Sequence, residues 1–123
     1  MKIRHKRYGQ VTNKSWGNVV RIVDSEENNY SGKLLNINQN ESTSVHFHSN
    51  KHKTFYVLQG TLTIEIIEPD NAELVLYSVD SEECFEIEQN VAHRLIAKDG
   101  GVTVIEVSTF HHDDDVFRVQ AKP

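Results

Sequence analysis

The amino-acid sequence predicts an all-β fold of the jelly-roll type, and two patterns support this prediction. Short apolar runs rich in Val, Ile, Leu and Tyr recur along the 123 residues, and no longer stretch keeps the period of a helix. Clusters of Asn, Asp, Ser and Gly separate these runs and are typical of turns. Many short strands in a chain of this length close into a sandwich or a barrel, which favours a jelly roll.

The strands follow one another through the sequence with no domain boundary, internal repeat or low-complexity linker. We therefore expect residues 1–123 to form one domain, in which residues 1–13 are an N-terminal arm or an additional strand. The acidic run at residues 113–115, which follows His111 and His112, is expected to be a solvated loop, with a second metal site as the alternative. The expected strands cover residues 19–24, 30–38, 44–48, 54–59, 62–68, 73–79, 84–88, 92–97 and 102–109.

Charge and cysteine content narrow the class of function. The net charge of −5 and the pI near 5.8 argue against nucleic acid or an anionic membrane as a partner, which leaves a small molecule. The basic residues 1–7 precede no apolar stretch and therefore resemble neither a signal peptide nor an anchor. The single cysteine, Cys84, cannot form an internal disulfide, which agrees with a reducing compartment. We expect a cytoplasmic protein.

Two histidines one residue apart, His46 and His48, lie on one predicted strand. Side chains at positions i and i+2 of a strand point to the same side, so both imidazoles reach one point in space. A third histidine, His93, lies on a later strand. Three imidazoles of this kind suit Zn, Ni or Fe. The alternative is a pair of histidines on a solvated strand.

The same alternation predicts the oligomeric state. If His46 and His48 face a barrel interior, Val45 and Phe47 face outward. Contiguous apolar patches on a surface usually mark interaction sites, so we expect a homodimer formed through this face.

Residues 46–60 resemble the first motif of the cupin family, which begins with two histidines one residue apart and continues with a glutamate and a glycine. Residues 87–94 are similar to its second motif, which contains a single metal-binding histidine. Residues 14–17, 105–109 and 113–118 are similar to the ends of the cupin domain of type II mannose-6-phosphate isomerases. The resemblance covers residues 14–119 and implies a single-domain cupin jelly-roll barrel.

The resemblance implies that His46, His48 and His93 bind a divalent metal such as Zn, Ni, Fe or Mn. The glutamate of the motif falls on Lys53, whose ammonium cannot bind a cation. A shorter spacing places His52 there instead, as the fourth ligand. In the second motif Gln89 and Asn90 replace a proline-glycine turn, and asparagine tolerates the left-handed conformation that glycine supplies.

The resemblance also implies an aldose–ketose isomerase that acts on a sugar or sugar phosphate. The metal polarises the sugar oxygen while a side chain moves the neighbouring proton. The candidate acid–base groups are Lys53, His48 and Glu106. The candidate phosphate ligands are Lys33, Arg94 and Arg118.

Three alternatives stay open. In the first, no metal binds, Lys53 occupies the vacated position and His46 or His48 is the general base, as in cupin sugar-nucleotide ketoisomerases and epimerases. In the second, the chain is a non-catalytic sugar-binding cupin. In the third, the three histidines hold iron in a dioxygenase.

Overall fold

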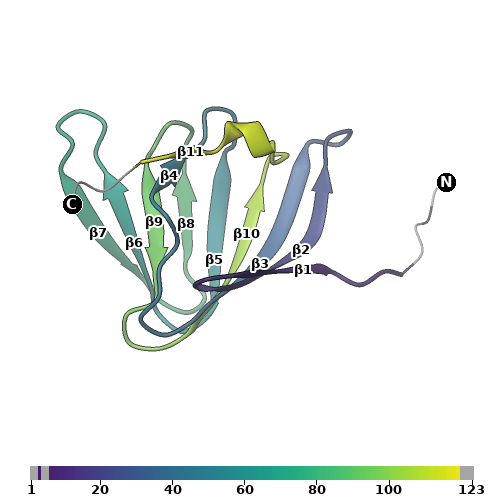
Figure 1. Cartoon of the computed structure of the whole chain (residues 1–123), viewed down its shortest axis with the longest axis horizontal. Coiled ribbons are helices and arrows are strands. Elements are labelled where there is room, and N and C mark those ends of the chain that lie inside the picture. Colours follow the sequence, from purple (N-terminus) through teal and green to yellow (C-terminus); the bar gives the residue numbers. More distant parts are fainter. Residues whose placement is uncertain (1–2, 4–5, 120–123) are drawn as a thin grey trace.

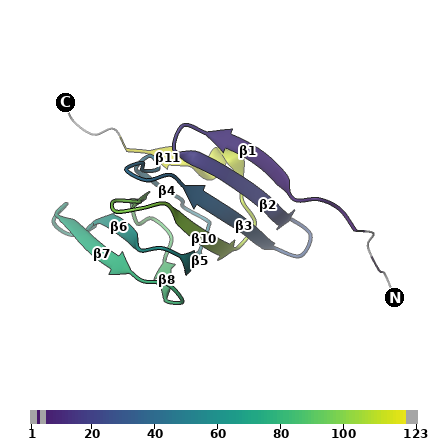
Figure 2. The ribbon, with the colours of Figure 1, turned by 90° about the horizontal axis from the view of Figure 1, so that it is seen from below.

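The computed structural model describes residue 3 and residues 6–119, and the strands form two antiparallel sheets that face each other (Figures 1 and 2). The larger sheet has the order β1-β2-β3-β10-β5-β8, and the smaller has the order β11-β4-β9-β6-β7. The elements are β1 (Gln10–Lys14), β2 (Gly17–Ser25), β3 (Tyr30–Ile37), β4 (His46–Phe47), β5 (Lys53–Gln59), β6 (Leu62–Ile67), β7 (Leu74–Val79), β8 (Cys84–Ile87), β9 (His93–Ile96), β10 (Val102–Ser108), the 3-10 helix η1 (Asp113–Asp115) and β11 (Phe117–Arg118).

Strict alternation of side chains fills the space between the sheets. In β6, and in β5 as far as Val57, every second residue is buried, and Phe55, Val57, Leu62 and Ile64 have no solvent exposure. Burial of these apolar side chains drives the two sheets together. The same alternation carries polar residues inward near the strand ends, among them Glu106. Buried polar side chains therefore lie next to the apolar core, between the same two sheets.

The nine strands predicted from the sequence are all present, and two strands were not predicted individually. Strand β1 is exposed at every residue and lacks an apolar alternation. It pairs with β2 at the outer edge of the larger sheet (Figure 2), so the predicted N-terminal arm contains a strand. Residues 1, 2, 4 and 5 of that arm lie outside the described residues. Strand β11 has two residues, too few for a pattern.

Two turns require unusual backbone angles. Asn90 has a φ of 65°, as expected for the asparagine that replaces a glycine, and its N–H donates to the carbonyl of His48 at 2.7 Å. Gly17 has a φ of 150°, and an added Cβ would lie 1.8 Å from the carbonyl oxygen of Asn36. Only glycine fits this close approach.

The C-terminal segment closes one end of the barrel, where η1 and β11 cross the ends of the strands (Figure 1). The expectation of a solvated acidic loop is wrong for Asp115, which is buried. Its carboxylate accepts hydrogen bonds from the backbone N–H groups of Ser49 and Asn50 and from the Ser49 hydroxyl, at 2.8, 3.1 and 2.6 Å. The segment is therefore anchored beside His48. Within the part of the chain that the structure describes, no helix is long and apolar enough to span a membrane.

Candidate functional site

A cavity of about 550 Å³ lies between the two sheets. Its volume falls within the range of sites for small molecules. The larger sheet contributes Lys33, Lys53 and Glu106 to its wall, and the smaller sheet contributes His46 and His93. Apolar residues line part of the wall, namely Trp16, Val19, Leu35, Phe55, Leu95 and Val116.

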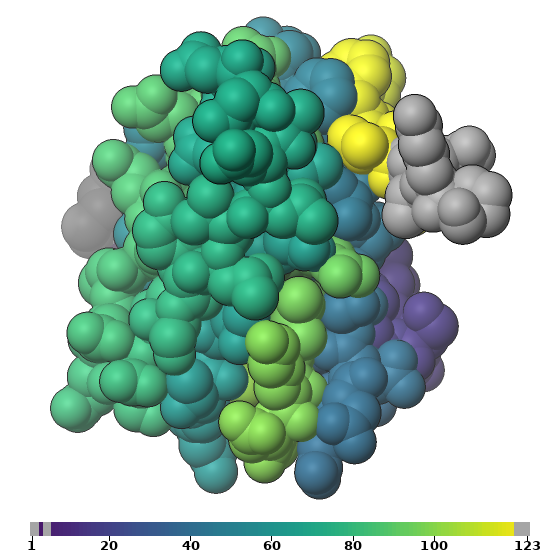
Figure 3. All heavy atoms as spheres, turned by 90° about the vertical axis from the view of Figure 1, so that its left-hand side faces the viewer, coloured from purple at the N-terminus to yellow at the C-terminus, as the bar shows by residue number. Residues whose placement is uncertain are grey.

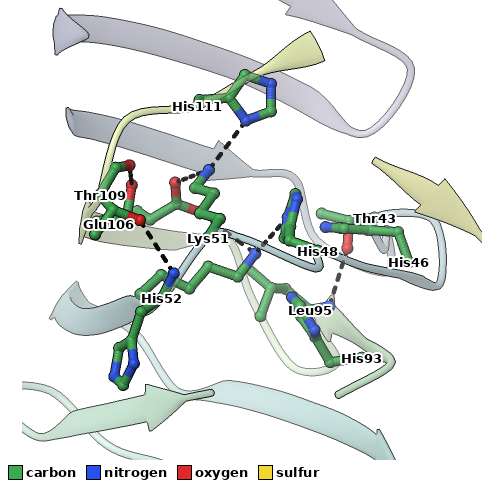
Figure 4. Close-up of polar contacts among 12 residues, drawn as sticks. Thr43, His46, His48, Lys51, His52, His93, Leu95, Glu106, Thr109 and His111 are labelled. Atoms are coloured by element: carbon green, nitrogen blue, oxygen red, sulfur yellow. Dashed lines mark hydrogen bonds and ion pairs between the residues drawn. The ribbon is translucent and has the colours of Figure 1, made fainter. Parts of the chain in front are cut away.

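The three histidines of the two motifs meet in this cavity (Figure 4). Their ring centroids are 5.1 Å apart for His46 and His48, and 4.8 Å apart for His46 and His93. Each ring places Nδ1 within 3.0 Å of a backbone carbonyl oxygen, of Ser44, Asp115 and Val91 respectively. A carbonyl only accepts, so Nδ1 carries the proton and Nε2 carries the lone pair.

The environment keeps these rings neutral. Burial, with the Lys53 ammonium as the next cause, lowers the pKa of His46 to about 4, of His48 to about 3 and of His93 to about 2. Desolvation disfavours the charged imidazolium, and a nearby cation adds to the effect. At neutral pH the rings are hydrogen-bond acceptors that face the cavity.

Lys53 points into the cavity from the start of β5. Its ammonium lies 3.3 Å from His48 Nε2 and 3.8 Å from Glu106 Oε1, and its side chain is 3% exposed. It also lies 5.2 Å from the centre of the Phe55 ring. Burial lowers the pKa of Lys53 to about 8, against the opposing attraction of Glu106. The amine is therefore close to its titration range at physiological pH.

A second buried lysine was not identified from the sequence. Lys51 lies in the loop before β5, and its ammonium contacts Glu106 Oε2 at 2.9 Å and His111 Nδ1 at 3.3 Å (Figure 4). Glu106 therefore lies between two lysines, and their charges hold its pKa well below the usual range despite its burial. The spacing of Lys51 and Lys53 could have indicated this role. Residues two positions apart in an extended segment point to the same side, so an inward Lys53 implies an inward Lys51.

Two predicted site residues lie elsewhere. The structure does not bring His52 to the other histidines: its ring points away from the cavity and pairs with Glu86 at 3.1 Å (Figure 4). Arg94 pairs with Glu65, its partner in the β6–β9 register, and does not line the cavity. Alternation explains both, because each residue is next to one that faces inward. Lys33 and Arg118 do line the cavity.

The donor set does not fit a resident divalent ion while Lys53 keeps this position. Three neutral imidazoles with lone pairs on Nε2 are suitable donors, and the buried Nε2 of His93 has no hydrogen-bond partner. However, the position of the anionic ligand is taken by an ammonium 3.3 Å from His48 Nε2, which would strongly repel a divalent cation. Among residue 3 and residues 6–119, no group of three or more His, Cys, Asp or Glu side chains has the arrangement of a metal site.

Comparison with known proteins identifies the fold. No protein-family model and no curated protein matches the sequence. Among solved structures, the chain is similar to the capsular polysaccharide assembling protein CapF from Staphylococcus aureus, with a TM-score of 0.80 and 15% identity over 92% of this chain and 34% of that chain. It is also similar to oxalate decarboxylase from Bacillus subtilis, with a TM-score of 0.79 and 13% identity over 90% of this chain and 30% of that chain.

The chain thus spans about a third of the length of these solved chains. Identities of this size establish the fold alone. The observed sheets and these similarities agree with the prediction from the sequence. The chain has the all-β cupin jelly-roll fold.

Proposed function

We propose that this chain catalyses proton transfer at the carbon next to a carbonyl group of a sugar, as an isomerase or epimerase that needs no resident metal. The observation that carries this proposal is the pair formed by His48 and Lys53. His48 Nε2 accepts a hydrogen bond from the Lys53 ammonium at 3.3 Å on the wall of the cavity. One accepts a proton and the other donates one, as the reaction requires.

His48 is the general base and Lys53 is the general acid. His48 Nε2 takes the proton from carbon, and the electron pair of the C–H bond forms a C=C bond. Lys53 gives a proton to the carbonyl oxygen, which yields a neutral enediol. For an aldose–ketose isomerisation, His48 returns its proton to the adjacent carbon, and the neighbouring hydroxyl returns a proton to Lys53 as it becomes the new carbonyl.

The charges of the pair support this order of events. The Lys53 cation contributes to the low pKa of His48. When Lys53 transfers its proton to the substrate oxygen, that cation disappears and the ring becomes a stronger base as it accepts the proton from carbon. Glu106, 3.8 Å from Lys53, then favours return of the proton to the lysine.

Two further observations support a sugar as the substrate. The resemblance of the sequence ends to type II mannose-6-phosphate isomerases suggests a hexose phosphate. The similar fold of the capsular polysaccharide assembling protein suggests a sugar of a polysaccharide precursor. The cavity combines polar groups with the Trp16 and Phe55 rings, a combination suited to a sugar ring.

Hydrogen exchange between substrate and solvent tests the proposal. In deuterated water, mannose 6-phosphate, fructose 6-phosphate or a nucleotide-linked ketosugar should acquire deuterium next to the carbonyl, as NMR will detect. His48→Gln should lower the exchange rate by about 10²–10⁴. The matched control is His112→Gln, because His112 is exposed and does not line the cavity.

Two outcomes would contradict the proposal. Exchange that persists undiminished in the His48→Gln variant would remove the pair from the reaction. Failure of every sugar phosphate and nucleotide-linked ketosugar to exchange would favour a sugar-binding role without catalysis.

A further inference from the structure

We infer that the cavity contains a subsite for a doubly charged anion, formed by Lys33 and Lys51 with His111 as the residue that orients Lys51. The inference rests on the proposed function in one respect: it names the group, a phosphate or a pair of carboxylates, by which the substrate is held beside His48 and Lys53.

The cavity is strongly cationic in a chain that is acidic as a whole. Within residues 6–119 its wall carries five basic side chains and a single carboxylate, whereas the whole chain has a net charge of −5. The histidines add no charge near neutral pH. The positive charge is therefore concentrated in this cavity. The five basic residues are Lys14, Lys33, Lys51, Lys53 and Arg118, and the carboxylate is Glu106.

Glu106 cannot neutralise the lysines that surround it. Lys51 and Lys53 both contact its carboxylate, and Lys33 lies opposite it in the β3–β10 register. Within the described part of the chain, the carboxylate of Glu106 is thus the one buried negative charge near three ammonium groups. Buried charges in proteins are normally paired, because removal from water is costly. A ligand with two negative charges would complete the pairing.

Lys51 has a free donor for such a ligand. Its ammonium has three N–H bonds, and the described residues give it two contacts, Glu106 and His111. His111 accepts from Lys51 through Nδ1, while its Nε2 lies 3.4 Å from Asp113. This arrangement fixes the ring and holds the Lys51 ammonium against the cavity.

Lys33 lines the same cavity as Lys51 and His111. Burial lowers the pKa of His111, and the charges of Lys33 and Lys51 add to this effect. The carboxylates that oppose Lys33 are Glu106 and Asp24, yet within residues 6–119 neither forms an ion pair with it within 4 Å. Two ammonium groups therefore remain available to oxygens of one anionic group, whereas His48 and Lys53 face the reacting part of the substrate.

Calorimetry with inorganic phosphate, malonate and acetate tests this subsite in the full chain. We expect phosphate or malonate to bind with one site per chain and acetate to bind far more weakly. Lys51→Met and Lys33→Met should each weaken binding by about tenfold or more, since each removes a charged hydrogen bond. Lys98→Met is the matched control, because Lys98 is exposed and outside the cavity.

The dianion that binds more tightly indicates which group of the substrate the subsite holds. Tighter binding of phosphate indicates a phosphorylated substrate, and tighter binding of malonate indicates a dicarboxylate. A rise in the melting temperature of the unmodified chain with the tighter ligand gives a second readout that needs no variant. Absence of binding and of any thermal shift at 10 mM of either dianion would overturn the inference. Binding that both lysine variants leave unchanged would show an adventitious ion only.

His48→Gln separates this inference from the proposed function. The variant should bind the dianion as the unmodified chain does, even though it loses proton exchange. If the subsite is real and the proposed chemistry is wrong, the dianion binds and no sugar exchanges.

Discussion

Glu106 is the residue on which the charges of the site depend. Among the described residues it is the only carboxylate on the cavity wall, and it contacts both Lys51 and Lys53. Without it, buried ammonium groups would face one another with no opposing charge. Removal of one partner from a buried ion pair is strongly destabilising, whereas exposed pairs contribute little.

We predict that Glu106→Gln lowers the free energy of unfolding by about 3–5 kcal/mol at pH 7. The lysines hold the pKa of Glu106 below its ordinary value of 4.5, so its contribution is complete above pH 4.5 and is lost as the pH falls toward the lower pKa of the folded state. Urea unfolding at pH 7 and pH 3 should therefore give a smaller difference between variant and unmodified chain at pH 3.

The control for this experiment is Glu86→Gln. Glu86 is exposed and pairs with His52 at the surface, so its loss should change the free energy of unfolding by about 1 kcal/mol or less. A difference for Glu106→Gln that is equally large at both pH values would contradict the role of the carboxylate charge.

The sequence predicted the side chains that lie together in the cavity where the alternation of strand residues and the spacing of a motif agree. His46 and His48 share a side because they are two residues apart, and the second motif supplied His93. The sequence also marked Lys53 as the residue that decides between metal and no metal. It did not reveal Lys51 as a site residue, because Lys51 lies in a loop whose burial depends on the folded barrel.

At the scale of elements, the segment of η1 and β11 organises the site. Strand β11 pairs with β4, and Asp115 holds Ser49 and Asn50 while its carbonyl fixes the tautomer of His48. A C-terminal segment therefore sets the geometry of a motif more than sixty residues earlier, with a separation of 67 residues for the His48 contact.

We predict that Asp115→Asn loosens this anchor. An amide has one acceptor oxygen in place of two, so it cannot accept from Ser49 and Asn50 as the carboxylate does. Hydrogen exchange measured by NMR should become faster at the Ser49 and Asn50 amides. Asp114→Asn, at an exposed neighbouring position, should leave these amides unchanged. Equal protection in both variants would show that Asp115 does not hold the loop.

A strand could be predicted from the sequence when one of its faces is buried in the barrel. The nine strands with an apolar alternation follow from the sequence, because one face of each packs in the barrel. Strand β1 buries nothing, and β11 is held by pairing with β4 and by the stacking of Phe117 on Phe47. Strand β1 depends on hairpin pairing with the neighbouring β2, and β11 depends on contacts with a segment far away in the sequence.

At the scale of the whole molecule, the outward face of β4 bears on the predicted homodimer. Phe47 is half-buried beneath Phe117, which is 42% exposed and extends this apolar surface to the sheet edge. The opposite edge of the same sheet is β7, on the side of the molecule that faces the viewer in Figure 3. A substitution at an exposed apolar residue of β7 can therefore serve as the control for one at β11.

We predict a homodimer that buries the face of Val45, Phe47 and Phe117, with a mass by light scattering of about twice the 14.1 kDa of the chain. Phe117→Asp should shift the protein toward monomer, because a charge would be buried in the interface. Leu74→Asp, on β7, should leave the mass unchanged. A monomer at micromolar concentration would contradict the prediction.

The most direct test of the central claim, that Lys53 takes the place of a metal beside the three histidines, is elemental analysis of protein purified without a tag and without chelator. We expect far less than one divalent metal ion per chain. Lys53→Glu should raise the metal content toward one, because it replaces the repelling ammonium with a carboxylate beside His46, His48 and His93. One metal ion per chain in the unmodified protein would contradict the account.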